Sequence, residues 1–258
     1  MKRYPVACKD KKQYMERTPE YNQLVERDMR NRLAPDFDAR YIRDKGFWFH
    51  KTEVDSIVSA LTCMKDDIVF DAGAGTGRIS IPIAPKVRRL VCVDFSEESI
   101  SLLREKLSPN LYDRVHCIVA DLNNLPVQKI RFDKIVSVQV IQHVPSHCRR
   151  LSVLRSFHGL LKKGGRLAFT VSRWNGAVRT NKEGYYGEQL YRYAFESDEV
   201  KTLAEEAGFT GVCVRPLIVQ HLRLQRFGLW TTYLDRMLAR FLNPKQFGQF
   251  LLVTARKE

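Results

Sequence analysis

The chain has 258 residues, 44% of them hydrophobic, so it can bury a sizeable core and fits one domain with additions. No apolar run approaches the ~20 residues of a membrane-spanning helix, and the first residues hold no stretch of signal-peptide length. We therefore expect a cytoplasmic protein without stable membrane insertion. The six cysteines include no Cys-x-x-Cys pair, so neither a disulfide framework nor a zinc site is indicated.

The net charge of +14 is large for this length, and it is unevenly placed. Residues 1–50 carry +4, residues 51–150 carry +2 and residues 151–258 carry +8. Such a field attracts nucleic acid, anionic lipid or an acidic small substrate. A solvated, solubilising surface explains it equally well, because no run of five consecutive basic residues occurs. Charge alone leaves the partner open.

The pattern before residue 50 is helical. In "EYNQLVERDMRNRL" the apolar residues share one helical stripe, with Pro19 suited to the first position of the helix and Pro35 to its interruption. An aromatic cluster at 47–49 leads into a second helix. We interpret residues 1–50 as an N-terminal helical lid or extension and residues 51–258 as the main domain.

From residue 67 onward, short apolar runs alternate with helical stretches. Strands are predicted at 67–72, 89–95, 115–120, 134–140, 166–172, 212–219 and 249–255, and helices around 77–84, 96–107, 147–162, 197–207 and 226–242. This alternation is typical of an α/β fold with a parallel sheet and crossover helices on both faces. Two insertions, near 173–195 and 220–246, interrupt it, and we expect them to shape a substrate site.

The stretch "VFDAGAGTGR" at 69–78 places glycines at 73, 75 and 77 directly after an apolar strand. A dinucleotide fingerprint would need its third glycine where Arg78 stands, and a Walker loop would end in Gly-Lys-Ser/Thr. What remains is a loop whose backbone approaches a ligand closely, at the start of a helix that favours an anionic group.

Polar groups follow the next three predicted strands. Asp94 comes 21 residues after Gly73, near the spacing at which an acid binds ribose hydroxyls. Asp121 can accept from an exocyclic amine, and Gln139 ends the fourth strand. Phe95 is available to lie against an adenine ring. The set indicates a nucleoside with an anionic tail and no required phosphate.

The run "VFDAGAGTGR … VCVDFSEESI … ADLNNLPV … FDKIVSVQVIQHV … LLKKGGRLAFTV" resembles the successive motifs of class I S-adenosylmethionine-dependent methyltransferases, in particular the ubiquinone and menaquinone biosynthesis group. The resemblance implies a Rossmann-like sheet of seven strands whose last strand is inserted antiparallel. It implies that Asp71 and the glycine loop hold the methionine portion, Asp94 the ribose, and Asp121 with Leu122 the adenine. The predicted cofactor-binding residues are Asp71, Gly73, Gly75, Gly77, Arg78, Asp94, Phe95, Asp121, Leu122 and Gln139.

Methyl transfer from a sulfonium needs in-line positioning of the nucleophile, and a base only if the nucleophile must lose a proton. His143 is the first candidate base, because a histidine after the fourth strand can face the acceptor in related small-molecule enzymes. A structural histidine is the alternative. His50 is a second candidate, with an anchoring role in its aromatic cluster as the alternative. No metal site is predicted, since Pro145 separates His143 from His147.

The acceptor stays open between several classes. The first class is a small molecule, of which an anionic one is a variant, enclosed by aromatic residues of the insertions: Trp174, Tyr185, Tyr186, Trp230 and Tyr233. RNA, in particular tRNA, is the alternative, because the C-terminal part mixes arginine with aromatic residues. A lipid or quinone at a membrane surface is a variant of the first class. A protein acceptor, or a non-catalytic partner that binds the cofactor, is a weaker alternative.

Overall fold

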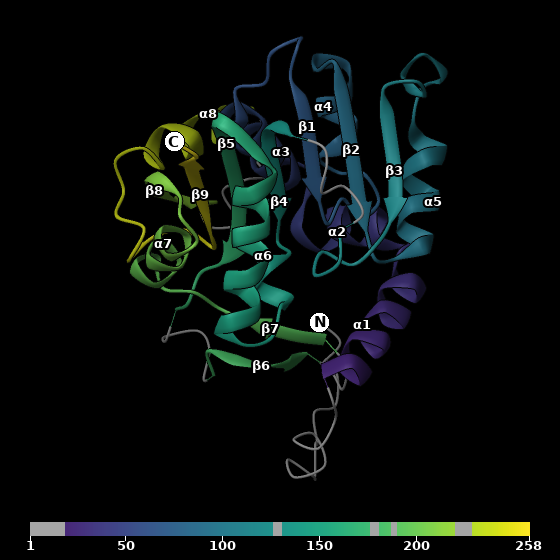
Figure 1. The fold of residues 1–258 in the computed structure, drawn as a ribbon. Helices are drawn as coiled ribbons and strands as arrows, with labels where there is room; N and C mark the ends of the chain where they lie inside the picture. The colour runs from purple at the N-terminus through teal and green to yellow at the C-terminus, as the bar shows by residue number, and fades with distance from the viewer. Residues whose placement is uncertain (1–18, 126–130, 176–180, 187–189, 220–228) are drawn as a thin grey trace.

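The computed structural model describes residues 19–125, 131–175, 181–186, 190–219 and 229–258 (Figure 1). Its centre is a seven-stranded sheet in the order β3-β2-β1-β4-β5-β9-β8. The strands are β1 (Ile68–Ala72), β2 (Arg89–Asp94), β3 (Val115–Val119), β4 (Phe132–Val138), β5 (Leu161–Ser172), β8 (Thr210–Leu217) and β9 (Phe250–Arg256). β9 runs antiparallel between β5 and β8. The predicted seven-stranded, mostly parallel sheet with an antiparallel last strand is confirmed.

Helices cover both faces of the sheet. They are α1 (Pro19–Leu33), α2 (Phe37–Lys45), α3 (Phe47–Leu61), α4 (Ser80–Ile83), α5 (Glu97–Lys106), α6 (His147–Leu160), α7 (Ser197–Glu206) and α8 (Leu229–Leu238). The apolar sides of α6 and α7 pack in one core cluster, and those of α3, α4 and α5 pack in the other. The strands are buried on both sides as a result: Phe70 points into the first cluster and Val69 into the second.

The N-terminal helices follow the sequence pattern with two differences. α1 begins at Pro19, as predicted, but a further helix, α2, follows Pro35 where only an interruption was expected. The expected domain boundary at residue 50 falls inside α3. The helix predicted at 77–84 is also shorter, because the glycine turn extends to Ile79 and leaves only α4 and a 3-10 turn.

The insertion at 173–195 contains a hairpin that the sequence did not predict. β6 (Glu183–Tyr186) pairs antiparallel with β7 (Leu190–Tyr193). Figure 1 shows this hairpin and α1 below the ends of the central strands. Of the second insertion, residues 220–228 lie outside the described residues, and α8 packs on α3 through the Thr52 and Thr232 hydroxyls, 3.2 Å apart. In the described part of the chain, no helix has both the length and the apolar character of a membrane span.

Candidate active site

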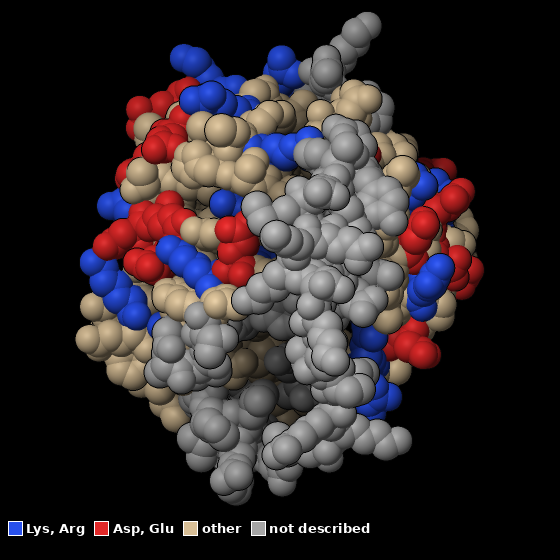
Figure 2. All heavy atoms as spheres, turned by 90° about the horizontal axis from the view of Figure 1, so that it is seen from below, with Lys and Arg blue, Asp and Glu red and all other residues tan. Residues whose placement is uncertain are grey.

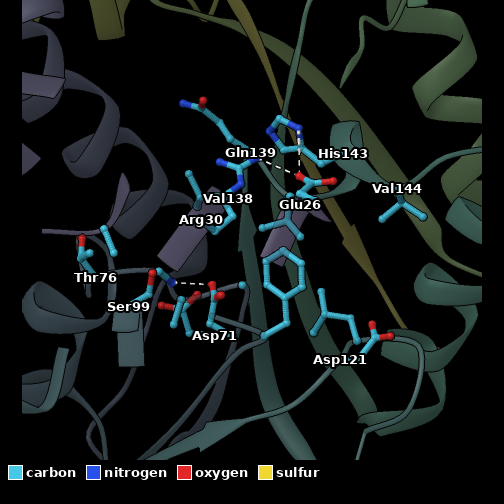
Figure 3. A pocket seen from close by; sticks show the side chains of 18 of the residues that line it. Glu26, Arg30, Asp71, Thr76, Ser99, Asp121, Val138, Gln139, His143 and Val144 are labelled. Carbon is cyan, nitrogen blue, oxygen red and sulfur yellow. Dashed lines mark hydrogen bonds and ion pairs between the residues drawn. The ribbon is translucent and has the colours of Figure 1, made fainter. Parts of the chain in front are cut away.

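A cavity of about 310 Å³ lies at the carboxyl ends of β1 to β4 (Figure 3). The strand ends form its floor, while α1, α2 and β7 contribute Arg30, Tyr41 and Tyr191 to its wall. Most residues predicted from the sequence meet here: Asp71, Gly73, Gly75, Arg78, Asp94, Phe95, Asp121, Leu122, Gln139 and His143 all line it. Four separate strand ends thus form one site, because parallel strands present their carboxyl ends at the same edge.

The glycine loop is fixed to the end of β2. The backbone N–H groups of Gly73 and Ala74 both donate to the carbonyl oxygen of Val93, at 2.8 and 3.0 Å. Gly73 has φ +80°, and a Cβ added there would stand 2.2 Å from a methyl carbon of Val140. Only glycine satisfies both the backbone angle and this close approach of the β1 and β4 ends.

Asp71, the residue before the last of β1, carries a buried carboxyl group. The Ser80 hydroxyl donates to its Oδ2 at 2.6 Å. Burial raises the pKa of Asp71 to about 7, against the opposing effect of the Ser80 hydrogen bond. A buried carboxyl with so high a pKa favours a cationic neighbour, because a positive charge would restore its ionised form.

Asp94 and Asp121 stand at the ends of the neighbouring strands. The carboxylate of Asp94 accepts from the backbone N–H of Gly75 at 2.8 Å and from that of Ser96 at 2.9 Å. Burial raises the pKa of Asp94, and the two N–H groups oppose the rise. Asp121 accepts from the Asn123 backbone at 2.9 Å. Along the order β3-β2-β1, the cavity floor carries Asp121, Asp94 and Asp71 in turn.

Two predicted residues do not line this cavity. Gly77 instead serves packing, because a Cβ added there would stand 3.0 Å from Cγ of Leu103 on α5. His50 lines a neighbouring, more open pocket together with Gly77, Lys51 and Lys106. Burial lowers the pKa of His50, and its Nδ1 has no hydrogen-bond partner among the described residues. The structure therefore brings His143, and not His50, to the cavity at the strand ends.

His143 has both ring nitrogens in contact with polar groups. Its Nδ1 lies 2.6 Å from the carbonyl oxygen of Tyr191, and its Nε2 lies 3.2 Å from the amide nitrogen of Gln142. Burial, together with the positive charge of Arg30, holds the pKa of His143 well below its usual value. This environment keeps the ring neutral.

Sequence reasoning missed a pair of charged residues on α1. Glu26 projects into the cavity, accepts from Arg30 at 3.1 Å and has its Oε1 3.9 Å from His143 Nδ1 (Figure 3). Its side chain is 12% exposed, and burial raises its pKa. A Glu and an Arg four residues apart normally indicate a solvated helix face, so the sequence carried no sign of this burial.

A second missed residue is Glu53 on α3, whose side chain is fully buried. Glu53 lies four residues after Phe49 and four before Ile57, and both of these are completely buried. Its place on the apolar stripe of the helix therefore indicates that its side chain is buried. Its carboxylate contacts Arg78 and Gln139, two of the predicted cofactor-binding residues.

The geometry agrees with comparisons to known proteins. Residues 69–165 match the model of a methyltransferase domain. The chain is 27% identical over 183 residues to a probable S-adenosylmethionine-dependent methyltransferase of Mycobacterium tuberculosis, and this alignment covers 71% of the chain and 61% of the relative. The chain thus spans about three fifths of that relative's length.

Two further similarities involve different acceptors. Over 138 residues the chain is 26% identical to the tRNA (carboxymethyluridine(34)-5-O)-methyltransferase of Xenopus tropicalis, covering 54% of this chain and 20% of that protein. A solved structure of Burkholderia thailandensis 1,6-didemethyltoxoflavin-N1-methyltransferase, with its acceptor and S-adenosylhomocysteine bound, is 20% identical and has a TM-score of 0.62. That match covers 99% of this chain and 92% of the other and shows the shared fold. The chain thus contains a methyltransferase domain at residues 69–165, and it is similar to S-adenosylmethionine-dependent methyltransferases.

Proposed function

We propose that the protein transfers the methyl group of S-adenosylmethionine to a small-molecule acceptor. The observation that carries this proposal is the enclosure of the cavity: α1 and the β6–β7 hairpin extend over the strand ends, and Glu26 and Tyr191 from these elements line the same space as Asp71 and Asp94. A cavity of about 310 Å³, lined by apolar and polar groups together, is of the size that small ligands occupy.

The residues present fit the cofactor in strand order. Asp121 with Leu122 would hold the adenine, Asp94 the ribose hydroxyls, and Asp71 with the glycine loop the amino-acid portion. The loop supports this placement because Gly73, Gly75 and Arg78 line the cavity next to Asp71, and glycine lets the backbone come close to a ligand. When bound, the cofactor supplies an electrophilic methyl group on a sulfonium, and the protein's part is to orient the acceptor in line with it.

Glu26 is better placed than His143 to accept a proton from the acceptor. Both ring nitrogens of His143 are bonded to neighbouring groups, whereas Glu26 faces the cavity from α1. A carboxylate whose pKa is raised by burial is a stronger base than an exposed one. His143 then holds the backbone of Tyr191 in place, and an acceptor with an O–H or N–H group would meet Glu26.

Two arginines of the cavity wall favour an acceptor with an acidic group, although Asp71, Asp94, Asp121 and Glu26 line the same space. Arg30 and Arg149 both line it, from α1 and α6. The wider positive charge of the chain would raise the local concentration of such an acceptor. The finer resemblance to quinone-biosynthesis enzymes stays a prediction, as does the cytoplasmic location.

RNA is the second candidate acceptor, favoured by one observation. The outer side of α8 and the residues after it expose Trp230, Tyr233 and Phe241, with exposed fractions of 80%, 62% and 84%. Aromatic side chains next to arginine can stack on unpaired bases. Against this, Figure 2 shows Lys and Arg interspersed with Asp and Glu over the described surface at the cavity end of the molecule. A surface of mixed charge does not select a polyanion.

The test is transfer of a radiolabelled methyl group from S-adenosylmethionine into a cell extract, followed by separation into RNA, protein and small molecules. Label in the small-molecule fraction supports the proposal. Ribonuclease-sensitive label in the RNA fraction would replace it with the second candidate. Label in protein would contradict both.

A further inference from the structure

Glu53 holds together three segments that are distant in sequence. Its carboxylate accepts from the Tyr41 hydroxyl at 2.5 Å, from Arg78 Nη1 at 2.5 Å and from Gln139 Nε2 at 2.6 Å. These partners come from α2, from the glycine loop and from the residue after β4. Burial opposes ionisation of Glu53, but Arg78 and the three hydrogen bonds outweigh it and hold the pKa of the carboxyl below its usual value. Glu53 is therefore a buried anion.

All three partners line the cavity, whereas Glu53 stands behind them. The guanidinium carbon of Arg78 lies 4.1 Å from the centroid of the Tyr41 ring, so the aromatic face and the carboxylate fix it together. Gln139 adopts φ +58°, an unfavourable angle for a residue with a side chain, and its amide is held by Glu53. Backbone strain of this kind persists only where surrounding contacts hold the residue in place, and here the Glu53 carboxylate provides such a contact.

The position of this cluster in the sheet identifies the part of the ligand it faces. Asp121 and Asp94, at the ends of β3 and β2, occupy the nucleoside side of the cavity in the proposed placement. Gln139 follows β4, on the opposite side of β1. A ligand that extends from the first side to the second brings its non-nucleoside end to Arg78 and Gln139. For S-adenosylmethionine that end carries a carboxylate and an ammonium group.

We propose that Glu53 is a positioning residue for the amino-acid end of S-adenosylmethionine. It orients Arg78, whose guanidinium has five N–H donors, so that donors not directed at Glu53 meet the ligand carboxylate. It also turns the Gln139 amide nitrogen away from the ligand. The proposal rests on the proposed cofactor placement, and it assigns to α3, which lies before the matched domain, a part in cofactor recognition.

The test compares two ligands by calorimetric titration. S-adenosylhomocysteine has the amino-acid end, whereas 5′-methylthioadenosine has the nucleoside and the sulfur without it. For Glu53→Gln we expect a loss of S-adenosylhomocysteine affinity of tenfold or more, with 5′-methylthioadenosine affinity changed less than threefold. Asp55→Asn is the matched control, since Asp55 lies on the same helix and pairs with Lys51 at a partly exposed site. It should change neither affinity.

If Glu53 only supported the fold, Glu53→Gln would lower the affinity for both ligands equally. That result, or an unchanged affinity for both ligands, would overturn the proposal. Gln139→Leu provides a second variant that leaves the Glu53 and Arg78 charges paired, for use if Glu53→Gln does not fold. Gln139→Leu should lower the affinity for S-adenosylhomocysteine less than Glu53→Gln does and leave the affinity for 5′-methylthioadenosine unchanged. An equal loss of affinity for both ligands would again overturn the proposal. Failure of the wild-type protein to bind either ligand would instead contradict the cofactor placement on which the proposal depends.

Discussion

The Nδ1 atom of His143 lies 2.6 Å from the backbone carbonyl oxygen of Tyr191, which comes 48 residues later in the chain. A carbonyl oxygen only accepts, so the proton of the imidazole must reside on Nδ1. Nε2 then accepts from the Gln142 amide, whose oxygen is already bonded to the N–H and the hydroxyl of Ser172. This chain of contacts selects one neutral tautomer and joins the end of β4 to the hairpin.

We expect His143 to stay neutral, with its proton on Nδ1, from pH 5 to pH 8. Burial and the charge of Arg30 both oppose protonation. Nitrogen chemical shifts of the imidazole, assigned by loss of the signal in His143→Gln, would measure the protonation state. A titration with a midpoint near 6.5 would contradict the expectation and restore His143 as the candidate base.

Glu26→Gln should slow methyl transfer to the small-molecule fraction by roughly 10² to 10⁴, the usual contribution of a general base. Affinity for S-adenosylhomocysteine should change little, because the proposed contact is with the acceptor. Asp28→Asn, an exposed neighbour on α1, is the control. A wild-type rate in Glu26→Gln would show that the acceptor reacts without losing a proton to this group.

Asp94→Ala should weaken binding of S-adenosylhomocysteine by roughly 1 to 3 kcal/mol, because a buried carboxylate that accepts from ribose hydroxyls would be lost. Calorimetric titration measures this directly. Asp113→Ala, at an exposed position before β3, should leave the affinity as it is. Equal affinities for wild type and Asp94→Ala would remove Asp94 from the ribose site.

The free energy of unfolding of the ligand-free protein should fall as the pH rises from about 4 to 7. The pKa of Asp71 is raised by burial to about 7, so in this window the folded state retains a proton that the unfolded chain releases. The fall should be of the order of a few kcal/mol, because a tenfold difference in proton affinity between the two states is worth roughly 1.4 kcal/mol. Asp71→Asn should remove this contribution, and urea unfolding at pH 4.5 and 7.5 would measure it. Parallel pH dependence in both proteins would exclude the effect.

Gly73→Ala should abolish cofactor binding and destabilise the fold, because its Cβ would overlap Val140 and its φ is +80°. The double variant Gly73→Ala/Val140→Ala should recover part of the stability, since it removes the overlap but not the backbone strain. Thermal unfolding with and without S-adenosylhomocysteine separates the two effects. A single variant as stable as wild type would show that the loop can relax.

Patterns along the chain were enough to predict the sheet and the residues on the floor of the site. Alternating apolar strands and helices specify a mostly parallel sheet. Asp71, Asp94, Asp121 and Gln139 lie at or just after the carboxyl ends of four of its strands, so their meeting at one edge is a consequence of topology. The role of Gly73 could also be predicted, because a glycine directly after a buried strand indicates that the loop backbone lies close to neighbouring atoms. These features depend on the spacing of residues along the chain, and this spacing can be taken directly from the sequence.

The packing of separate elements sets what closes the cavity and which groups the buried charges contact. Glu26 lies on a helix whose charged residues have the spacing of a solvated face, and its burial depends on where α1 packs. The sequence did not predict the hairpin of β6 and β7. It therefore did not predict that Tyr191, on β7, would be the hydrogen-bond partner of His143. Glu53 reaches Gln139 across 86 residues. Such contacts arise from the packing of separate elements, and packing is not encoded in the periodicity of any one of them.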